Sequence, residues 1–364
     1  MNPPLRQGTM ERGVRRYWKG DAGPLAATLL TAVTAPMAAL FGVAVRLRNR
    51  AFDTGLLRSH TVPVPVISVG NLSVGGTGKT PVAGWIVDRL VARGCTPAVV
   101  SRGYGEDEIA LHRRWHPGVA VTANPDRVAA ALEAVDRGAD VVVLDDGFQH
   151  RALARDADIV LVSAHDPFPP RLLPRGPWRE PLGALQRASL VLVTGKGDEG
   201  IRSGEDLLVV LHDLPQHPPL GRVGILASGW RTLGGESAQP PEPGEEVLAV
   251  ASIAHPQELE RMLREAGLGG GPEGPSLELL AYPDHHAYTE AQVGRILERA
   301  GGRRIVTTEK DAVKLAAFAP LVEAVPAPRV LTLRVDPAPG VDRLLDRLLD
   351  RALARGGDRE GGRA

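Results

Sequence analysis

One stretch of the sequence determines how the rest is interpreted: Val66-Ile67-Ser68-Val69-Gly70-Asn71-Leu72-Ser73-Val74-Gly75-Gly76-Thr77-Gly78-Lys79-Thr80. A short apolar run, typical of a buried strand, leads into a glycine-rich turn and then into a helical pattern. Glycines let backbone N–H groups converge on phosphate oxygens, and the N-terminus of the following helix adds its dipole. We therefore predict a nucleotide phosphate-binding loop at Ser73, Val74, Gly75, Gly76, Thr77, Gly78, Lys79 and Thr80.

The residue types within this loop match particular tasks. Lys79 is placed to reach the β- and γ-phosphates, and the Thr80 hydroxyl to ligate Mg²⁺. The general pattern has glycine where Ser73 stands, so Gly75 and Gly76 would supply the unusual backbone angles instead. The alternative is a glycine turn that merely begins a helix.

The use of lysine supports the nucleotide interpretation. Almost all basic residues are arginines, and the five lysines are Lys19, Lys79, Lys196, Lys310 and Lys314. A position that requires a compact ammonium group resists replacement by the planar guanidinium of arginine. Lys79 is such a position.

A metal-binding partner for the loop is expected at the end of a neighbouring strand. The apolar run 141–144 is followed directly by Asp145 and Asp146. Charges that follow a buried strand lie at its carboxyl edge, where ligands of parallel sheets bind. We predict that Thr80, Asp145 and Asp146 form the Mg²⁺ site, with Asp145 closest to the metal and Asp146 in an outer or water-orienting role. A solvated acidic turn is the alternative.

Length and periodicity predict an α/β protein with more than one unit. Residues 61–214 alternate continuous apolar strands with helices, which indicates a P-loop NTPase-type parallel sheet flanked by helices. A Pro- and Gly-rich stretch then leads into a second, smaller α/β unit, which we place at 215–340, followed by a terminal helix and disordered tail at 341–364. Basic and acidic residues are equal in number, which argues against a nucleic-acid partner, and the single Cys95 excludes an internal disulfide framework.

The N-terminal segment 1–60 contains a long apolar run. Residues 22–45 carry no charge and are long enough to span a bilayer. Arginines and a lysine flank the run on both sides, which does not fit a single crossing but fits a helix lying on or dipping into an anionic leaflet. We therefore predict a membrane-associated helix; a buried core helix is the alternative.

Six motifs in this order give the chain a specific resemblance. They are Gly70 to Pro81, Ser101-Arg102-Gly103-Tyr104-Gly105, Asp145 to His150, Leu173 to Glu180, Asp284-His285-His286, and Thr308-Glu309-Lys310-Asp311-Ala312-Val313-Lys314. With these motifs the chain resembles the tetraacyldisaccharide 4'-kinase family of Gram-negative bacteria. The resemblance runs from the N-terminal apolar segment to about residue 335.

The resemblance implies that the chain transfers the γ-phosphoryl group of ATP to the 4'-hydroxyl of a tetraacylated glucosamine disaccharide 1-phosphate, a lipid A precursor. It implies ATP and Mg²⁺ as cofactors and the inner-membrane lipid surface as a partner, with no obligate protein partner. The expected location is the cytoplasmic face of the inner membrane, as a peripheral or monotopic protein. It also implies a site in the cleft between two α/β units.

The catalytic residues implied by the resemblance are Asp107 and His285. Asp107 would accept the proton of the acceptor hydroxyl, and His285 would orient or tune it. The spacer before the Asp107-Glu108 pair is short here, and Ile109 stands where the family has proline, so the assignment is open by one residue. His286 is the alternative to His285, and two adjacent histidines also leave a transition-metal site open.

Further residues are candidates for contacts with substrate: Asn71, Glu108, Gln149, His150, Arg179 and Glu180. Arginine suits bidentate phosphate recognition, so Arg179 is a candidate for the 1-phosphate. Structural hydrogen bonds are the alternative for these residues. The role of Thr308 to Asp311 is left unassigned.

Two other functions compete with the kinase. A membrane-associated P-loop switch or partitioning ATPase is disfavoured, because such proteins place a lysine where this chain has Val74. A soluble P-loop kinase or ligase for small polar substrates would not need the apolar segment 22–45.

Overall fold

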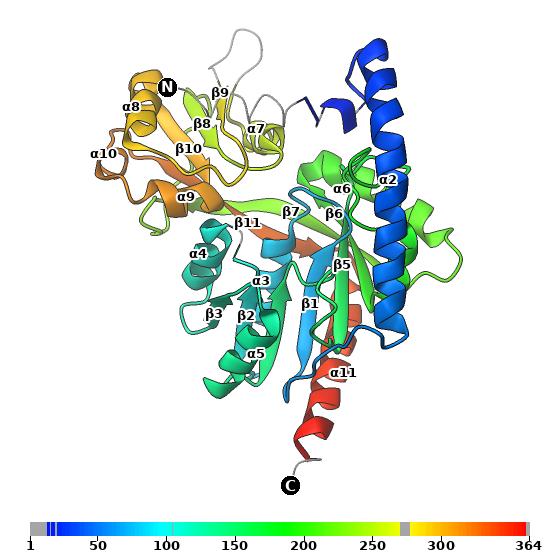
Figure 1. The fold of residues 1–364 in the computed structure, drawn as a ribbon. Helices are drawn as coiled ribbons and strands as arrows, with labels where there is room; N and C mark the ends of the chain where they lie inside the picture. Colours follow the sequence, from blue (N-terminus) through cyan, green and yellow to red (C-terminus); the bar gives the residue numbers. More distant parts are fainter. Residues whose placement is uncertain (1–12, 15, 19, 104, 270–276, 362–364) are drawn as a thin grey trace.

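The computed structural model describes residues 13, 14, 16–18, 20–103, 105–269 and 277–361, and within them the strands form one 11-stranded sheet. The strand order is β3-β2-β4-β1-β5-β6-β7-β11-β10-β8-β9 (Figure 1). The strands are β1 (Val66–Asn71), β2 (Pro97–Ser101), β3 (Ala120–Ala123), β4 (Val141–Asp145), β5 (Ala157–Ser163), β6 (Leu190–Lys196), β7 (Leu220–Arg231), β8 (Val247–Ala251), β9 (Leu277–Ala281), β10 (Arg304–Thr308) and β11 (Arg329–Pro337).

Neighbouring strands are parallel throughout, except at one place. The long strands β7 and β11 pair antiparallel, from Val223 opposite Pro337 to Arg231 opposite Val330. Strands β1 to β6 lie on one side of this pair and β8 to β10 on the other, so the pair joins two parallel halves into one sheet (Figure 1). The predicted parallel α/β fold is confirmed, and the antiparallel join is a feature that the sequence pattern did not indicate.

The helices cover the sheet as a parallel arrangement requires. They are α2 (Pro24–Asp53), α3 (Lys79–Val91), α4 (Glu106–Trp115), α5 (Arg127–Asp136), the 3₁₀ turn η1 (Leu182–Arg187), α6 (Gly197–His212), α7 (Pro256–Glu265), α8 (Glu290–Ala300), α9 (Glu309–Leu315), α10 (Ala319–Val322) and α11 (Val341–Gly361). The acidic triplet 106–108 forms the first turn of α4.

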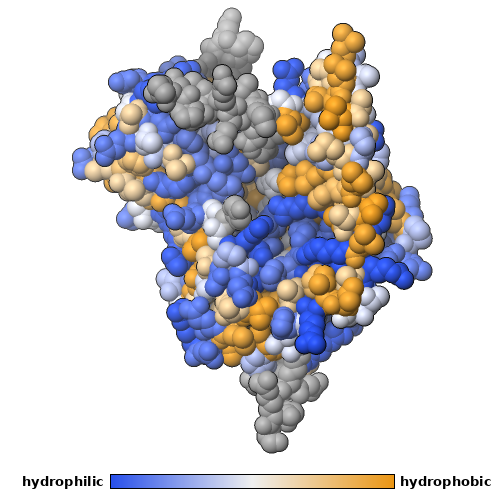
Figure 2. Space-filling view, in the orientation of Figure 1, coloured by the Kyte–Doolittle hydropathy of each residue, from blue (hydrophilic) through white to orange (hydrophobic). Residues whose placement is uncertain are grey.

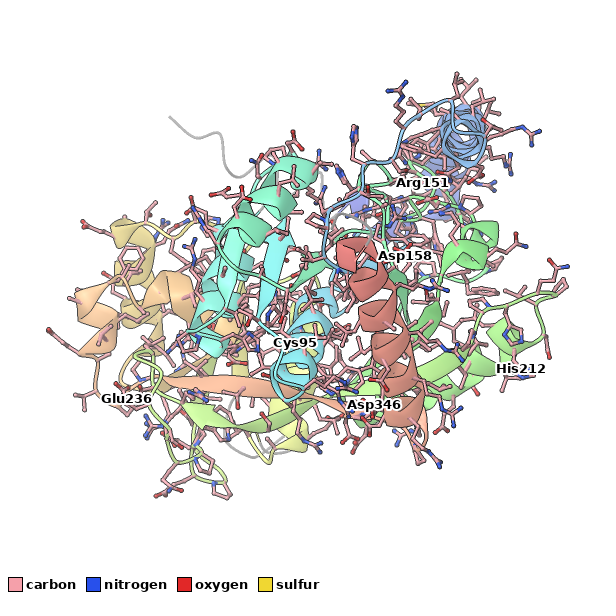
Figure 3. All side chains as sticks on the ribbon, turned by 90° about the horizontal axis from the view of Figure 1, so that it is seen from below. Cys95, Arg151, Asp158, His212, Glu236 and Asp346 are labelled. Atoms are coloured by element: carbon pink, nitrogen blue, oxygen red, sulfur yellow. The ribbon has the colours of Figure 1, made fainter. Side chains whose placement is uncertain are left out.

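The C-terminal helix α11 returns to the first half of the sheet. Val341, Leu345 and Leu349 are buried in the same apolar cluster as β1, α3 and β6. Arg89 of α3 and Arg93, which follows the end of α3, form ion pairs with acidic residues of α11, among them Asp346, which Figure 3 labels. The structure thus includes the helix expected after residue 340, and residues 362–364 of the predicted tail lie outside the described part of the chain.

The N-terminal helix α2 lies along one side of the molecule and exposes most of its apolar side chains. Leu25 is 82% exposed and Leu40 72% exposed, whereas Ala38 and Gly42 are buried. Figure 2 shows the surface of α2 as an orange, hydrophobic ridge. Within the described residues, α2 is one helix that is long and apolar enough to cross a membrane by length and composition. The expected apolar helix is therefore present, longer than predicted at its C-terminal end, and it is not a buried core helix.

Candidate active site

The phosphate loop lies between the buried strand β1 and helix α3, as the sequence predicted. Gly75 and Gly78 adopt positive φ angles of 128° and 85°, and Gly78 is the N-cap of α3. At this φ any side chain would be strained, and a Cβ at Gly78 would also have to displace Ile225 Cδ1 of β7, which lies 2.2 Å from its position. The glycines therefore allow the backbone turn, and Gly78 also allows β7 to approach the loop closely.

The loop is held from behind by buried polar groups. The Asn71 side-chain amide donates to Ser73 O (2.7 Å) and to Thr77 Oγ1 (2.9 Å), and Thr194 of β6 donates to Thr77 O (2.9 Å). Ser73 Oγ donates to Asp166 at 2.6 Å. Ser73 thus has a side-chain role that the glycine of the general pattern cannot have.

Asp145, at the end of β4, is 2% exposed and is positioned by a histidine. His112 Nε2 of α4 donates to Asp145 Oδ2 at 3.1 Å, and Asp145 Oδ1 is buried without a hydrogen-bond partner among the described residues. A buried carboxylate oxygen without a partner is costly unless a cation or water uses it. His112 is a site residue that sequence reasoning missed, because nothing in the local pattern around residue 112 points to β4.

Asp146 follows with a positive φ of 60° and faces two cations. Lys79 Nζ lies 3.6 Å from its carboxylate, and Arg179 Nη1 donates to both of its oxygens at 3.2 Å. Burial would raise the pKa of Asp146, but the charges of Lys79 and Arg179 outweigh it and lower the pKa. The phosphate-loop lysine, the second aspartate and Arg179 therefore form one ionic group.

Asp107 and His285 meet across the two halves of the sheet. His285 Nδ1 donates to Asp107 Oδ1 at 3.0 Å, and the opposite ring nitrogen of His285 accepts from Lys310 at 3.2 Å. Burial alone would raise the pKa of Asp107, but the His285 hydrogen bond and the charges of Lys310 and Lys314 lower it to about 2. The same hydrogen bond raises the pKa of His285.

His286 points elsewhere, so the pair involves His285. His286 Nε2 lies 3.0 Å from Gln292 Oε1, and its ring stacks on Tyr282. Within the described residues, no group of three or more histidine, cysteine, aspartate or glutamate side chains is placed to hold a metal ion.

Glu108 differs from its neighbour in both exposure and charge. Burial, and then repulsion from Asp145, raise the pKa of Glu108 to about 7. Glu108 lines the main cavity of the protein, which adjoins the phosphate loop, and its carboxylate lies 3.7 Å from Lys310 Nζ. Asp107 is 3% exposed and lies behind the wall of this cavity. Two adjacent carboxylates thus have distinct environments.

The remaining candidates form a network that leads from the phosphate loop to α2. Gln149 donates to Asn71 O (2.8 Å) and to Glu180 (3.2 Å), and Glu180 also accepts from Asn49 of α2 at 2.7 Å. Glu180 is 1% exposed and pairs with Arg187, so it is held inside the protein. Among Asn71, Gln149, His150, Arg179 and Glu180, Arg179 is the one that lines the main cavity.

His150 lies in a positively charged environment at the same end of α2. Burial, and then the charges of Arg127, Arg155 and Arg48, lower the pKa of His150 to about 4. Arg151, which Figure 3 labels near α2, stacks on Phe52 and pairs with Asp53. This arginine-rich end of α2 is a feature that spacing in the sequence did not reveal.

The cavity that joins these groups has a volume of about 830 Å³. Its polar wall contains the phosphate loop, Asp145, Glu108 and His285. Its apolar wall is made by Trp85, Leu111, Trp115, Met262, Leu331 and Leu333. Lys196 also lines it and pairs with Glu258 of α7 at 2.7 Å. A cavity with one ionic and one apolar end suits a nucleotide, with its phosphates at the loop.

Comparisons with known proteins show which family the chain is similar to. The family model described as Tetraacyldisaccharide-1-P 4'-kinase matches residues 30–353. The curated tetraacyldisaccharide 4'-kinase of an Anaeromyxobacter species is 40% identical, over 89% of this chain and 91% of the relative. That of Halorhodospira halophila is 39% identical, over 82% and 86%. The crystal structure of LpxK from Aquifex aeolicus in complex with ATP is similar at a TM-score of 0.68 and 25% identity, covering 89% of this chain and 99% of that one.

Proposed function

The chain belongs to the tetraacyldisaccharide 4'-kinase family, and we propose that its 830 Å³ cavity is where phosphoryl transfer takes place. The protein is an ATP-dependent kinase that phosphorylates the 4'-position of the lipid A disaccharide precursor and uses a divalent metal such as Mg²⁺. One observation carries the proposal. The phosphate loop, Asp145, Asp146 and His285 line the same cavity, and His285 pairs there with the buried Asp107.

The phosphate loop binds the triphosphate. Backbone N–H groups of Gly75 to Gly78 and the N-terminus of α3 face the phosphates, and Lys79 neutralises charge that develops on the transferred group. In the described structure Lys79 pairs with Asp146, so nucleotide binding would draw its ammonium away from that carboxylate. Arg179 then remains as the partner of Asp146.

The residues at the end of β4 fit a Mg²⁺ ion. Thr80 supplies a hydroxyl at the start of α3, and the unpartnered Asp145 Oδ1 supplies a buried anionic oxygen. Oxygen ligands of this kind, shared with phosphate, are those that Mg²⁺ prefers. When bound, the ion would neutralise charge on the phosphate oxygens, while His112 keeps Asp145 turned toward the loop.

The acceptor hydroxyl loses its proton as its oxygen attacks the γ-phosphorus and the bond to ADP breaks. We assign the Asp107–His285 pair to receive this proton, with Asp107 as the carboxylate that keeps the pair anionic. His285 is 39% exposed and lines the cavity, so it brings the pair within reach of substrate. Glu108 is the competing acceptor because its carboxylate lines the same cavity.

The substrate is a lipid, and α2 offers the surface on which the protein meets it. We propose that the exposed apolar ridge of α2 lies on the cytoplasmic leaflet of the inner membrane, as in a peripheral or monotopic protein. The arginine-rich end of α2, which includes Arg48 and Arg151, favours anionic headgroups. Gln149 and Glu180 link this end to the phosphate loop, which suits recognition of a substrate drawn from the leaflet.

Incubation with ATP labelled at the γ-phosphate tests the assignment. With the disaccharide 1-phosphate lipid in detergent micelles and Mg²⁺, we expect label in the lipid, and none without the metal. Label released only as inorganic phosphate would instead favour a P-loop ATPase that cycles on the membrane. Equal activity on small sugars without detergent would contradict the lipid-kinase proposal.

A further inference from the structure

The motif Thr308 to Lys314 spans the end of β10 and helix α9, and the reaction described above does not account for all of it. Glu309 accepts from Trp115 Nε1 of α4 at 2.9 Å and so helps to join the two halves of the protein. Lys310 lines the cavity beside Glu108 and His285. Lys314, one turn further along α9, stands behind the cavity wall and has no contact with the cavity.

Lys314 is fixed by a polar cluster in the second half of the protein. Its ammonium lies 3.1 Å from Asp311 Oδ1 and 2.5 Å from Ser252 Oγ, and 5.5 Å from the centre of the Tyr288 ring. Asp311 is fully buried and accepts further hydrogen bonds from Ser252 N, Tyr288 and Thr308. The ammonium therefore has one well-determined position.

From that position Lys314 reaches into the other half of the protein. Its ammonium lies 3.4 Å from Asp107 Oδ2, while His285 occupies Asp107 Oδ1. Glu108 N also donates to Oδ1 at 3.0 Å, and Lys310 Nζ lies 3.9 Å from Oδ2, so Lys314 is the nearer of two ammonium groups at that oxygen. Asp107 itself is 3% exposed, so these protein groups rather than bulk water surround its carboxylate.

We propose that Lys314 is a positioning residue for Asp107: anchored by Asp311, Ser252 and Tyr288, it fixes the Asp107 carboxylate in the orientation that pairs with His285. This inference rests on the proposed role of the Asp107–His285 pair. Because the partners of Asp107 come from the far side of the β7–β11 join, the proton-accepting pair is complete only when α4 and α9 are packed together.

A lysine serves this purpose better than an arginine. Its compact ammonium fits between two carboxylates, a hydroxyl and an aromatic ring, whereas a guanidinium is planar and longer. Removal of the ammonium leaves Lys310, 3.9 Å away, as the nearest cation to Asp107 Oδ2 and allows the carboxylate to turn toward it. A displacement of about 1 Å near the reacting atoms costs on the order of 10²-fold in rate.

The first test is the steady-state kinetics of Lys314→Met and Lys314→Arg in the full-length enzyme. We expect kcat of the methionine variant to fall by about 10²-fold with KM for ATP unchanged, and the arginine variant to recover part of that loss. Asp311 keeps its other donors in both variants, and a cooperative melting transition checks that each variant is folded before its kinetics are compared. Wild-type kcat in Lys314→Met, or a loss in KM for ATP alone, would overturn the proposal.

A matched control separates positioning of Asp107 from simple attachment of the two halves. Arg261 of α7 and Glu199 of α6 form an ion pair across the same two halves at 3.1 Å, away from Asp107. Glu199→Gln removes that pair, and we expect kcat to remain at the wild-type value. An equal loss of kcat in Glu199→Gln and Lys314→Met would show that Lys314 only holds the halves together.

A double-mutant cycle shows through which residue Lys314 acts. If it acts through Asp107, then Lys314→Met should cause no further loss of kcat in the Asp107→Asn background. If the fold losses of kcat in the two single variants multiply in the double variant, Lys314 acts independently of Asp107, which contradicts the inference. If Asp107→Asn alone keeps the wild-type rate, the proposed catalytic role of the Asp107–His285 pair is wrong. If Asp107→Asn is impaired but Lys314→Met keeps the wild-type rate, only the positioning role of Lys314 is wrong.

Discussion

The carboxylate of Asp107 and the imidazole of His285 lie 3.0 Å apart although 178 residues separate them in the sequence. Asp107 belongs to the first turn of α4, and His285 to the turn between β9 and α8, where its φ angle is 56°. A non-glycine residue in this conformation is uncommon and is typical of functional sites. The contact therefore links the chemistry of the site to the packing of the two halves of the sheet.

Replacement of Lys79 by methionine tests the phosphate loop. The substitution keeps the length of the side chain and removes the charge that faces the phosphates, so we expect phosphoryl transfer to fall by roughly 10²–10³-fold. The measurement is the rate of lipid phosphorylation at saturating ATP, with circular dichroism as the check on folding. Substantial turnover in a folded Lys79→Met protein would contradict the nucleotide site as described.

His150 gives a prediction for the pH dependence of stability. Its pKa in the folded protein is about 4, against an ordinary value of 6.5, so the unfolded chain binds this proton more tightly. The contribution of neutral His150 to stability is therefore complete above pH 6.5 and is lost as pH falls toward 4.

The comparison of wild type with His150→Gln isolates this contribution, because Glu108 and Asp166, whose pKa values are raised, titrate in the same range with the opposite sign. We expect acidification from pH 7.5 to 5 to lower the melting temperature of the wild type more than that of His150→Gln. Equal changes in the two proteins would show that His150 is not held in its neutral form.

The ridge of α2 predicts how the protein meets the membrane. Replacement of Leu25, Leu29 and Leu40, which are 82%, 69% and 72% exposed, by aspartate removes the apolar surface without disturbing the core. We expect the triple variant to leave the pellet when sedimented with anionic vesicles, and to keep its melting temperature. Val325→Asp, at a residue that is 90% exposed on the far half of the protein, is the control and should sediment like the wild type.

Helix α11 is predicted to be part of the core of the kinase rather than an appendage. Leu345 is fully buried in the cluster that contains β1, α3 and β6. Leu345→Ala should therefore lower the free energy of unfolding by about 2–5 kcal/mol, the usual range for a buried leucine. Urea denaturation measures this loss, and Arg351→Ala on the exposed side of the same helix should change it little.

Much of the first half of the fold was predictable because its signals are local. The apolar runs before Asn71 and Asp145 and the glycines of the loop each indicate their own structure within a few residues. Parallel pairing of β1 with β4 then places the carboxyl ends of both strands at one edge, which brings Asp146 close to Lys79 of the loop. Asp107 and His285 were identified by family resemblance, and neither local pattern alone indicates that they meet.

Other features depend on distant packing and had no local signal. The antiparallel pairing of β7 with β11 joins segments about 100 residues apart, and no periodicity specifies it. The contacts of His112 with Asp145, and of Lys314 with Asp107, arise because α4 lies between the phosphate loop and α9. The acidic triplet 106–108 begins a helix in which Asp107 is buried and Glu108 faces the cavity, and only the packing of α4 separates these two environments.

A single-turnover measurement is the most direct test of whether the Asp107–His285 pair accepts the proton of the 4'-hydroxyl. Enzyme in excess over γ-labelled ATP and lipid acceptor reports the chemical step separately from product release. For Asp107→Asn we expect a rate of label transfer to the lipid about 10²–10⁴-fold below that of the wild type, with ATP affinity unchanged. A wild-type rate in Asp107→Asn, together with a loss of transfer rate of that size in Glu108→Gln, would show that Glu108 and not the Asp107–His285 pair accepts the proton.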